Sequence, residues 1–190
     1  MSAFWIILII VAVLAFLLIG IYNNLVALRQ RTNQAFGDID VQLKQRHDLV
    51  PNLVETVKGY AAHERGTLEA VIAARQGAVD AEKTGNPAAM AQAEGVLGAT
   101  LGRLFALAEA YPNLKADANF QQLQAELSNL EDKIAAARRF FNNAVQEYNT
   151  GREQFPAVLF AGALGFGARE FFDLGEDRAK AEEAPKVSFS

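Results

Sequence analysis

The chain has 190 residues, of which 51% are hydrophobic and 21% charged, and its formal net charge is −4. This length suits one domain with an appendage, and the lack of a basic excess argues against nucleic-acid binding. With no cysteine, the chain cannot form disulfides, thiolate metal sites or a cysteine nucleophile. Its two histidines are too few for most transition-metal sites. No metal or cofactor is therefore expected.

The first elements of the chain are apolar. Residues 3–22 carry no charge, and the first charged side chain is that of Arg29. About 20 apolar residues in a helix span roughly 30 Å, the thickness of the hydrocarbon core of a bilayer. Trp5 and Tyr22 stand at the two ends of this run, where interfacial aromatic side chains are typical. A cleaved signal peptide needs a basic start and a small-residue cleavage site, and the run has neither. Residues 1–24 are predicted to be a transmembrane anchor.

The charges that flank the anchor predict its orientation. Arg29 and Arg31 follow the run, and no lysine or arginine precedes it. The positive-inside rule then places the short N-terminus outside and the C-terminal domain in the cytoplasm.

Beyond the anchor, apolar residues recur every three or four positions, the period of an amphipathic helix. No stretch has the alternation of a strand, so the fold is predicted to be all-α. The predicted helices cover residues 25–47, 51–80, 87–111 and 119–150, which together form the bundle of residues 25–150. Asn86 and Pro87 are a typical N-cap and first helical residue. Asp117 or Asn119 is expected to cap the last helix, and Gly151 to end it.

The segment Asp48-Leu49-Val50-Pro51-Asn52 separates the first two helical patterns. Pro51 has no amide proton and disfavours the α region at Val50. Two structures fit: one long helix kinked at Pro51, or a tight turn between two helices. The turn is favoured, because it gives helices of comparable length for an up-and-down antiparallel four-helix bundle. A continuous helix would leave half of its apolar face without a partner.

In such a bundle the last helix returns to the membrane near Thr150. Residues 155–168 follow without a charge, in a stretch too short to span a bilayer. They either cap the open end of the bundle or enter the membrane interface, and entry is favoured because large apolar surfaces are rarely left uncovered. The candidate membrane-interface residues are Trp5, Tyr22, Phe155, Phe160, Phe166, Phe171 and Phe172. Residues 151–172 are thus a hydrophobic membrane-proximal segment, and residues 173–190 a polar, partly disordered tail.

The sequence contains no hydrolase, P-loop or zinc-protease motif. The nearest acid–base pairs are Arg46-His47-Asp48 and His63-Glu64. Neighbouring residues on a helix point about 100° apart, so His63 and Glu64 do not converge on one substrate. Exposed or capping roles are expected for them, and no catalytic residue is predicted.

Several strings of the sequence together resemble the LemA family of bacterial membrane proteins. They are NNLVALR (23–29), AFGDIDVQLK (35–44), RHDLVPNLVETVKGY (46–60), AEAYPNLKA (108–116) and YNT (148–150). The resemblance implies an anchor in the bacterial inner membrane and a cytoplasmic four-helix bundle, and the family has no established enzymatic activity. One branch is tied to magnetosome membranes, and family genes often neighbour those of a membrane zinc protease. Gly151 departs from the charged or long residue usual at its position.

The leading functional hypothesis is a non-enzymatic scaffold or adaptor that works at the lipid bilayer with a protein partner. The candidate partner-contact residues are Leu49, Val50, Asn52, Tyr111 and Leu114. They belong to two turns expected side by side at the membrane-distal tip, and ordinary packing of helix connections is the competing interpretation. The alternative function is a membrane-shaping homo-oligomer that uses residues 155–172 as a second bilayer contact. A hydrolase or ligand sensor is not favoured, because no convergent polar site is visible.

Overall fold

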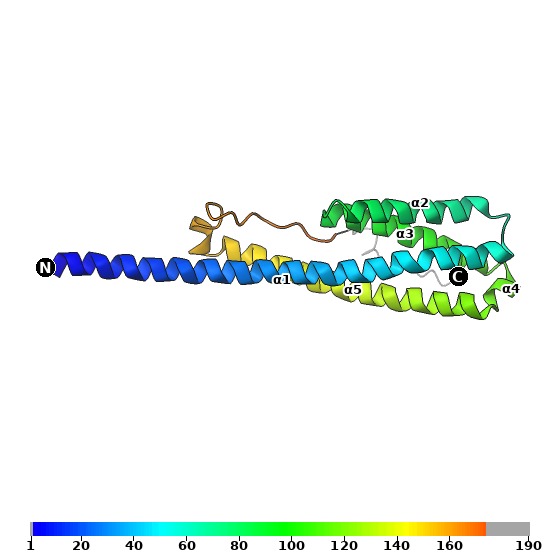
Figure 1. Cartoon of the computed structure of the whole chain (residues 1–190), viewed down its shortest axis with the longest axis horizontal. Helices are drawn as coiled ribbons and strands as arrows, with labels where there is room; N and C mark the ends of the chain where they lie inside the picture. Colours follow the sequence, from blue (N-terminus) through cyan, green and yellow to red (C-terminus); the bar gives the residue numbers. More distant parts are fainter. Residues whose placement is uncertain (1, 174–190) are drawn as a thin grey trace, which may run out of the picture. The chain divides into compact units, whose positions relative to one another are not determined.

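A computed structural model describes residues 2–173 of the chain (Figure 1). Within this range all regular structure is helical, as the sequence predicts. The helices are α1 (Ser2–Tyr60), α2 (Arg65–Glu82), α3 (Pro87–Ala108), α4 (Pro112–Lys115) and α5 (Ala118–Glu153), followed by the 3-10 turn η1 (Ala157–Leu159). Of the tail predicted at 173–190, all but Asp173 lies outside the described residues.

The described chain divides into two compact units. Unit 1 contains residues 2–37 and 139–169, and unit 2 contains residues 38–138 and 170–173. Helices α1 and α5 contribute residues to both units.

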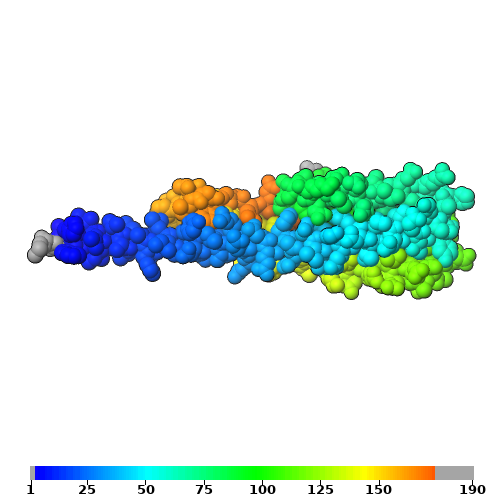
Figure 2. All heavy atoms as spheres, viewed as in Figure 1, coloured from blue at the N-terminus to red at the C-terminus, as the bar shows by residue number. Residues whose placement is uncertain are grey.

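The N-terminal part of α1 is the apolar run of the sequence. Every residue from Ala3 to Gly20 is exposed, and an 18-residue window has a mean hydropathy of 3.2 with none of its residues buried. In the view of Figure 2, the start of this stretch has no other segment against it. Among the described helices, this is the one long and apolar enough to cross a membrane. A helix that is apolar all round and unburied by protein suits a lipid environment.

Helix α1 continues through Pro51, so the turn predicted at residues 48–52 is wrong. Because proline lacks an amide proton, the carbonyl of His47 loses its usual donor one turn later. Arg75 of α2 supplies this hydrogen bond, since its Nε donates to the carbonyl oxygen of His47 at 2.7 Å. The turn between α1 and α2 instead covers residues 61–64.

A continuous α1 does not leave its apolar face uncovered, which corrects the second argument for the turn. Val50, Leu53, Val54 and Val57 are buried in a core that α1 shares with the other helices of unit 2. The partners in that core are Leu68 and Val71 of α2, Leu97, Leu101 and Leu104 of α3, Leu114 of α4, and Phe120 and Leu127 of α5. Burying each side chain of this size contributes about 1.5–3 kcal/mol, which favours a helix long enough to present all four.

The predicted N-cap at Asn86 is confirmed, and of the two candidates for the last helix, Asp117 and Asn119, it is Asp117 that forms the cap. The Asn86 side chain accepts a hydrogen bond from the backbone N–H of Ala89 at 2.8 Å, and Pro87 occupies the first turn of α3. The Asp117 carboxylate accepts one from the backbone N–H of Phe120 at 2.9 Å. Each cap satisfies a donor that the first helical turn leaves unpaired.

Two helix ends differ from the prediction. Helix α3 ends at Ala108, before the predicted end, and a separate short helix begins at Pro112. Helix α5 continues to Glu153, so Gly151 does not end it. Within unit 1, Gly151 instead faces α1, where a Cβ at this position would lie 2.6 Å from Cδ1 of Leu28 and the leucine side chain would have to move aside.

The hydrogen bond from Arg75 to the His47 carbonyl can be tested with a double-mutant cycle on the full-length protein in detergent micelles. Arg75→Met should lower the free energy of unfolding by about 1–2 kcal/mol, because it leaves the His47 carbonyl without a donor. In a Pro51→Ala background the same change should cost less than about 0.5 kcal/mol, because the restored amide donates to that carbonyl. Urea unfolding followed by circular dichroism measures both costs. Equal costs in the two backgrounds would contradict the assignment.

Candidate functional site

The chain after α5 turns back and packs against residues 18–29 of α1 and the C-terminal part of α5 in unit 1. Pro156 lacks the amide proton that a continuing helix would need, and Gly165 has a φ of 78°, a conformation that favours glycine. The side chains buried where this segment meets the two helices are Ala157, Ala161, Phe166, Leu25 and Tyr148.

Side chains of α5 hold the backbone of this segment. The Tyr148 hydroxyl donates to the carbonyl of Gly167 at 2.9 Å. The Asn149 side chain donates to the carbonyl of Arg169 at 2.9 Å and accepts from its backbone N–H at 3.0 Å. Each such bond contributes about 1 kcal/mol. The segment is therefore fixed to α5 by its backbone, independently of the apolar side chains it carries.

Phe166 packs against α1 at Tyr22, where the apolar run of that helix ends. Its ring centroid lies 5.6 Å from that of Tyr22 in an edge-on arrangement. The guanidinium carbon of Arg29 lies 5.0 Å from the centroid of the Phe166 ring, within the range of a cation–π interaction. The Nε of Arg152 donates to the Phe166 carbonyl at 3.3 Å. Two guanidinium groups thus converge on one residue beside Tyr22.

Other residues of the same segment remain exposed. The most exposed apolar side chains are Phe155 at 80%, Leu159 at 64%, Val158 at 50% and Leu164 at 42%. Leu164 also lines an apolar groove of about 330 Å³, together with Leu18, Ile19, Tyr22, Phe160 and Ala163. Contiguous apolar surface of this kind is typical of a membrane or partner contact. Figure 2 shows the segment in orange beside α1.

The structure separates the predicted membrane-interface residues into two groups. Trp5, Tyr22, Phe155 and Phe171 are exposed, and Phe160 lines the groove. Phe166 and Phe172 are only 1% exposed, so their assignment to the membrane interface is wrong. Phe166 belongs to the core of unit 1. Phe172 lies in unit 2, where the guanidinium of Arg138 is 5.3 Å from its ring centroid.

The predicted partner-contact residues do not form two adjacent turns. Val50 and Leu114 are fully buried in the core of unit 2. Leu49 and Tyr111 are partly buried against that core, and Asn52 is exposed on α1. Because residues 48–52 are helical, they provide no turn to pair with residues 111–116.

The turn that does meet this region is residues 61–64. The Tyr111 hydroxyl donates to Glu64 at 3.0 Å, and the Tyr60 hydroxyl donates to Asp117 at 2.8 Å. Each carboxylate stabilises the neutral phenol that donates to it, which raises the pKa of Tyr111 and of Tyr60. The backbone N–H of Phe120, followed by the Tyr60 hydroxyl, lowers the pKa of Asp117. These hydrogen bonds join the connection between α1 and α2 to the residues that flank α4.

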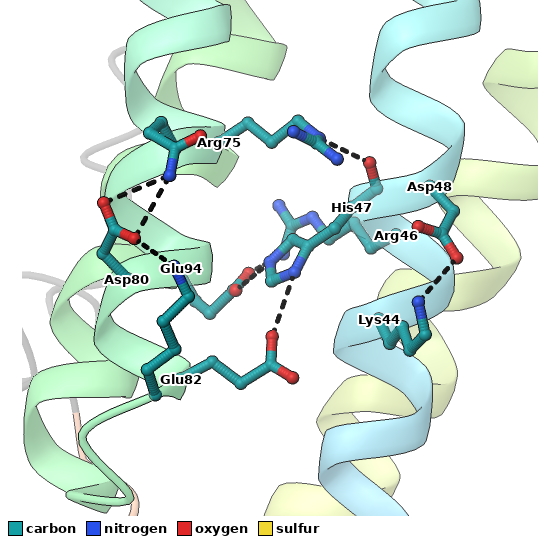
Figure 3. A network of polar contacts seen from close by, with 10 residues as sticks. Lys44, Arg46, His47, Asp48, Arg75, Asp80, Glu82 and Glu94 are labelled. Carbon is teal, nitrogen blue, oxygen red and sulfur yellow. Dashed lines mark hydrogen bonds and ion pairs between the residues drawn. The ribbon is translucent and has the colours of Figure 1, made fainter.

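Unit 2 also contains a buried ion network that the sequence reasoning missed (Figure 3). His47 Nε2 lies 2.6 Å from Glu94 Oε1, and His47 Nδ1 lies 3.4 Å from Glu82 Oε2. Arg46 Nη1 lies 3.4 Å from Glu94 Oε2 and 3.1 Å from Glu131 Oε2. Arg46, His47 and Glu94 are 5%, 3% and 7% exposed.

The network contains a histidine and carboxylates, the residue types of an acid–base pair, but His47 and Glu94 are not accessible to a substrate. Burial and then the nearby charge of Asp40 raise the pKa of Glu82, whereas the interaction with His47 acts in the opposite direction. The folded chain therefore holds a proton on Glu82 more tightly than the unfolded chain, so this group favours folding as the pH falls. Because His47 and Glu94 are shielded from solvent, the arrangement suits a structural role.

The two glutamates that face Arg46 differ in exposure and offer a matched test. Glu94→Gln should lower the free energy of unfolding by about 2–4 kcal/mol, because it leaves buried positive charge without its partner. Glu131→Gln should cost less than about 1 kcal/mol, because the Glu131 side chain is 57% exposed. Urea unfolding of the full-length variants measures both costs. A cost for Glu131→Gln as large as that for Glu94→Gln would contradict the assignment of Glu94 as the buried counter-charge.

Together, the unburied apolar helix, the apolar groove beside it and the closed helical core define a membrane-associated helical protein. Residues 35–189 match the LemA family, and the chain belongs to this family. The family resemblance seen in the sequence strings is thus confirmed.

Relatives of known name agree with this assignment. The chain is 28% identical over 186 residues to magnetosome protein MamQ 2 of Paramagnetospirillum magneticum, covering 86% of this chain and 68% of that protein. It is 26% identical over 174 residues to magnetosome protein MamQ of Magnetospirillum gryphiswaldense, covering 80% and 64%. It is 27% identical over 142 residues to protein LemA of Metamycoplasma hominis, covering 74% and 63%. The chain therefore spans about two thirds of the length of these relatives.

Proposed function

We propose that this LemA family protein is a non-enzymatic scaffold or adaptor of the bacterial inner membrane. The span in α1 anchors it, and the exposed apolar residues of 155–164 make a second contact with the bilayer. The observation that carries the proposal is the groove of unit 1, which residues of the span (Leu18, Ile19) share with Phe160 and Leu164. Lipid that surrounds the span at Leu18 also reaches the opposite wall of this groove. Leu164, on that wall, is then in contact with lipid as well.

Two features support a role without catalysis. The histidine–carboxylate pair His47–Glu94 is buried and satisfied by neighbouring charges. The tyrosines nearest to the helix connections, Tyr60 and Tyr111, are engaged by Asp117 and Glu64. Polar groups of these types serve catalysis when they converge on a space that a substrate can enter.

The charge of unit 1 supports a cytoplasmic position for the chain beyond the span. Unit 1 contains five arginines and two glutamates, a formal charge of +3, whereas the whole chain carries −4. Arg152 and Arg169 are distant from Arg29 in sequence, yet all three contact the Tyr148–Phe166 region. Positive charge beside a span favours the cytoplasmic side.

Because the chain has no cysteine, single-cysteine variants can test this orientation. Ser2→Cys should react with a membrane-impermeant maleimide added to intact spheroplasts, because the N-terminus is expected outside. Ser128→Cys, at an exposed position of α5, should react only after the membrane is permeabilised. Labelling of Ser128→Cys in intact spheroplasts would reverse the proposed orientation.

The surface of unit 2 best suited to a protein partner runs along α2 and α3. A groove of about 580 Å³ lies there, lined mainly by small residues: Ala70, Ala73, Ala74, Gly77, Ala89, Gln92, Ala93, Val96 and Thr100. Val96 is 53% exposed at this groove, and small side chains allow a helix of another protein to approach closely. The same surface could join two copies of the chain, which favours the membrane-shaping homo-oligomer as the second candidate.

Site-specific photo-crosslinking in native membranes distinguishes the two candidates. A photoreactive amino acid at Val96 should give a discrete crosslinked product, and the same group at Ser128 serves as the exposed control. Mass spectrometry of a product with a different protein supports the adaptor, whereas a product of two copies supports the homo-oligomer. The absence of any product specific to Val96 would argue against both uses of this groove.

A further inference from the structure

The arginines of unit 1 are concentrated around the segment that follows α5. The guanidinium of Arg29 lies over the ring of Phe166, and Arg152 donates to the carbonyl of the same residue. Arg169 lies with its guanidinium carbon 5.7 Å from the ring centroid of Tyr148. A guanidinium stacked on a ring still directs its N–H donors outward from its edge, where they can meet an anion.

The carboxylates of unit 1 offset this charge only in part. Glu153 pairs with Nη1 of Arg152 at 2.8 Å, and Glu147 pairs with Arg31 at 2.7 Å. The Glu153, Glu147 and Arg31 side chains are more than half exposed, so both pairs are weak. Unit 1 therefore keeps its formal charge of +3, while the remainder of the chain carries −7.

The side chain of Arg29 can reach the lipid headgroup region from its position on α1. Arg29 follows Tyr22 by two helical turns, about 10 Å along α1, and the headgroup layer extends about 5–7 Å beyond the hydrocarbon on each side. Side chains of a helix lean toward its N-terminus, which for α1 is the direction of the span. The contacts from Tyr22 to Phe166 at 5.6 Å and from Phe166 to Arg29 at 5.0 Å follow this direction.

The apolar groove lies on the span side of the same contacts. Tyr22 lines the groove and also contacts Phe166, so it joins the groove to the arginines. The other walls are carbon side chains of α1 and of residues 160–164. Because Leu18 and Ile19 belong to the span, the groove is continuous with the surface that faces hydrocarbon. An acyl chain can enter it without crossing water.

We propose that unit 1 carries a binding site for an anionic phospholipid. Arg29 and Arg152 bind the phosphate group, and the groove between α1 and residues 160–164 holds one acyl chain. This inference rests on the second bilayer contact of the proposed function. The net positive charge selects an anionic over a zwitterionic headgroup, and the groove selects a lipid over a soluble phosphate.

The test uses the full-length protein in phosphatidylcholine vesicles that contain trace spin-labelled phosphatidylglycerol or spin-labelled phosphatidylcholine. Electron paramagnetic resonance measures the fraction of each lipid immobilised by the protein. The wild-type chain should prefer phosphatidylglycerol by about three- to fivefold, and this preference should weaken at high salt. Arg29→Gln and Arg152→Gln should each bring the ratio close to one.

Three variants of the same chain control for general charge and for the groove. Arg139→Gln removes an exposed arginine of unit 1 about 20 Å along α5 from Arg152 and should leave the preference unchanged. Glu153→Gln should raise the preference, because it removes the carboxylate paired with Arg152. Ala163→Phe fills the groove and should reduce immobilisation of phosphatidylglycerol with the arginines intact.

An equal loss in Arg139→Gln and Arg29→Gln would overturn the site in favour of diffuse attraction. Competition by millimolar glycerol phosphate would show instead that the arginines bind a soluble phosphate. A fluorophore at Leu159→Cys, quenched by lipids labelled at known depths, separates this inference from the proposed function. Quenching in the bilayer without a preference for phosphatidylglycerol would overturn the lipid site alone. An unquenched fluorophore would overturn the second bilayer contact as well.

Discussion

The hydrogen bond from Arg75 to the carbonyl of His47 is the contact on which the course of α1 depends. A proline inside a helix costs about 3 kcal/mol, partly because one carbonyl loses its donor. A charged donor from α2 restores that bond, and the burial of the apolar stripe of α1 in the core of unit 2 offsets the remaining cost, so α1 continues. The turn into α2 therefore comes only after Tyr60. Helices α2 to α5 follow this turn, and each contributes side chains to the core of unit 2.

His47 unites three helices of unit 2 at one position. Its carbonyl is bound by Arg75 of α2, and its ring faces Glu82 of α2 and Glu94 of α3. Buried ion pairs of this kind add little net stability, because desolvation offsets most of the attraction. They do penalise other arrangements, since a shift of α3 by one turn would leave Glu94 buried away from both Arg46 and His47. We interpret the network as a device that fixes the register of α1, α2 and α3.

The sequence predicted the elements more accurately than their connections. Hydrophobic periodicity and helix caps located the all-α fold, the apolar span and the starts at Asn86 and Asp117, because these depend on local chemistry. The continuation through Pro51 depends on a side chain of another helix, which no local pattern reports. The surroundings of Gly151 likewise include a side chain of another helix, Leu28, which no local pattern reports.

The polar network has a signal in the sequence. His47 lies between Leu43 and Val50, and Glu94 lies between Met90 and Leu97, on stripes whose other members are buried. Charged residues on two apolar stripes predict a buried pair better than an exposed one. No such signal in the sequence indicates that Phe166 is buried and Phe155 exposed. Both stand in the same uncharged stretch, and only the contacts of Tyr22, Tyr148 and Arg29 determine which of them is buried.

The uneven distribution of charge also bears on how copies of the protein can approach one another. With +3 in unit 1 and −7 in the rest of the chain, two neighbouring copies repel wherever their acidic parts come within the screening distance of about 8 Å in physiological salt. Anionic lipids shared between the arginines of adjacent copies would partly neutralise the basic parts but not the acidic ones. Crowding of this protein in a membrane is therefore expected to depend on ionic strength and on multivalent cations, in the manner of a charged colloid.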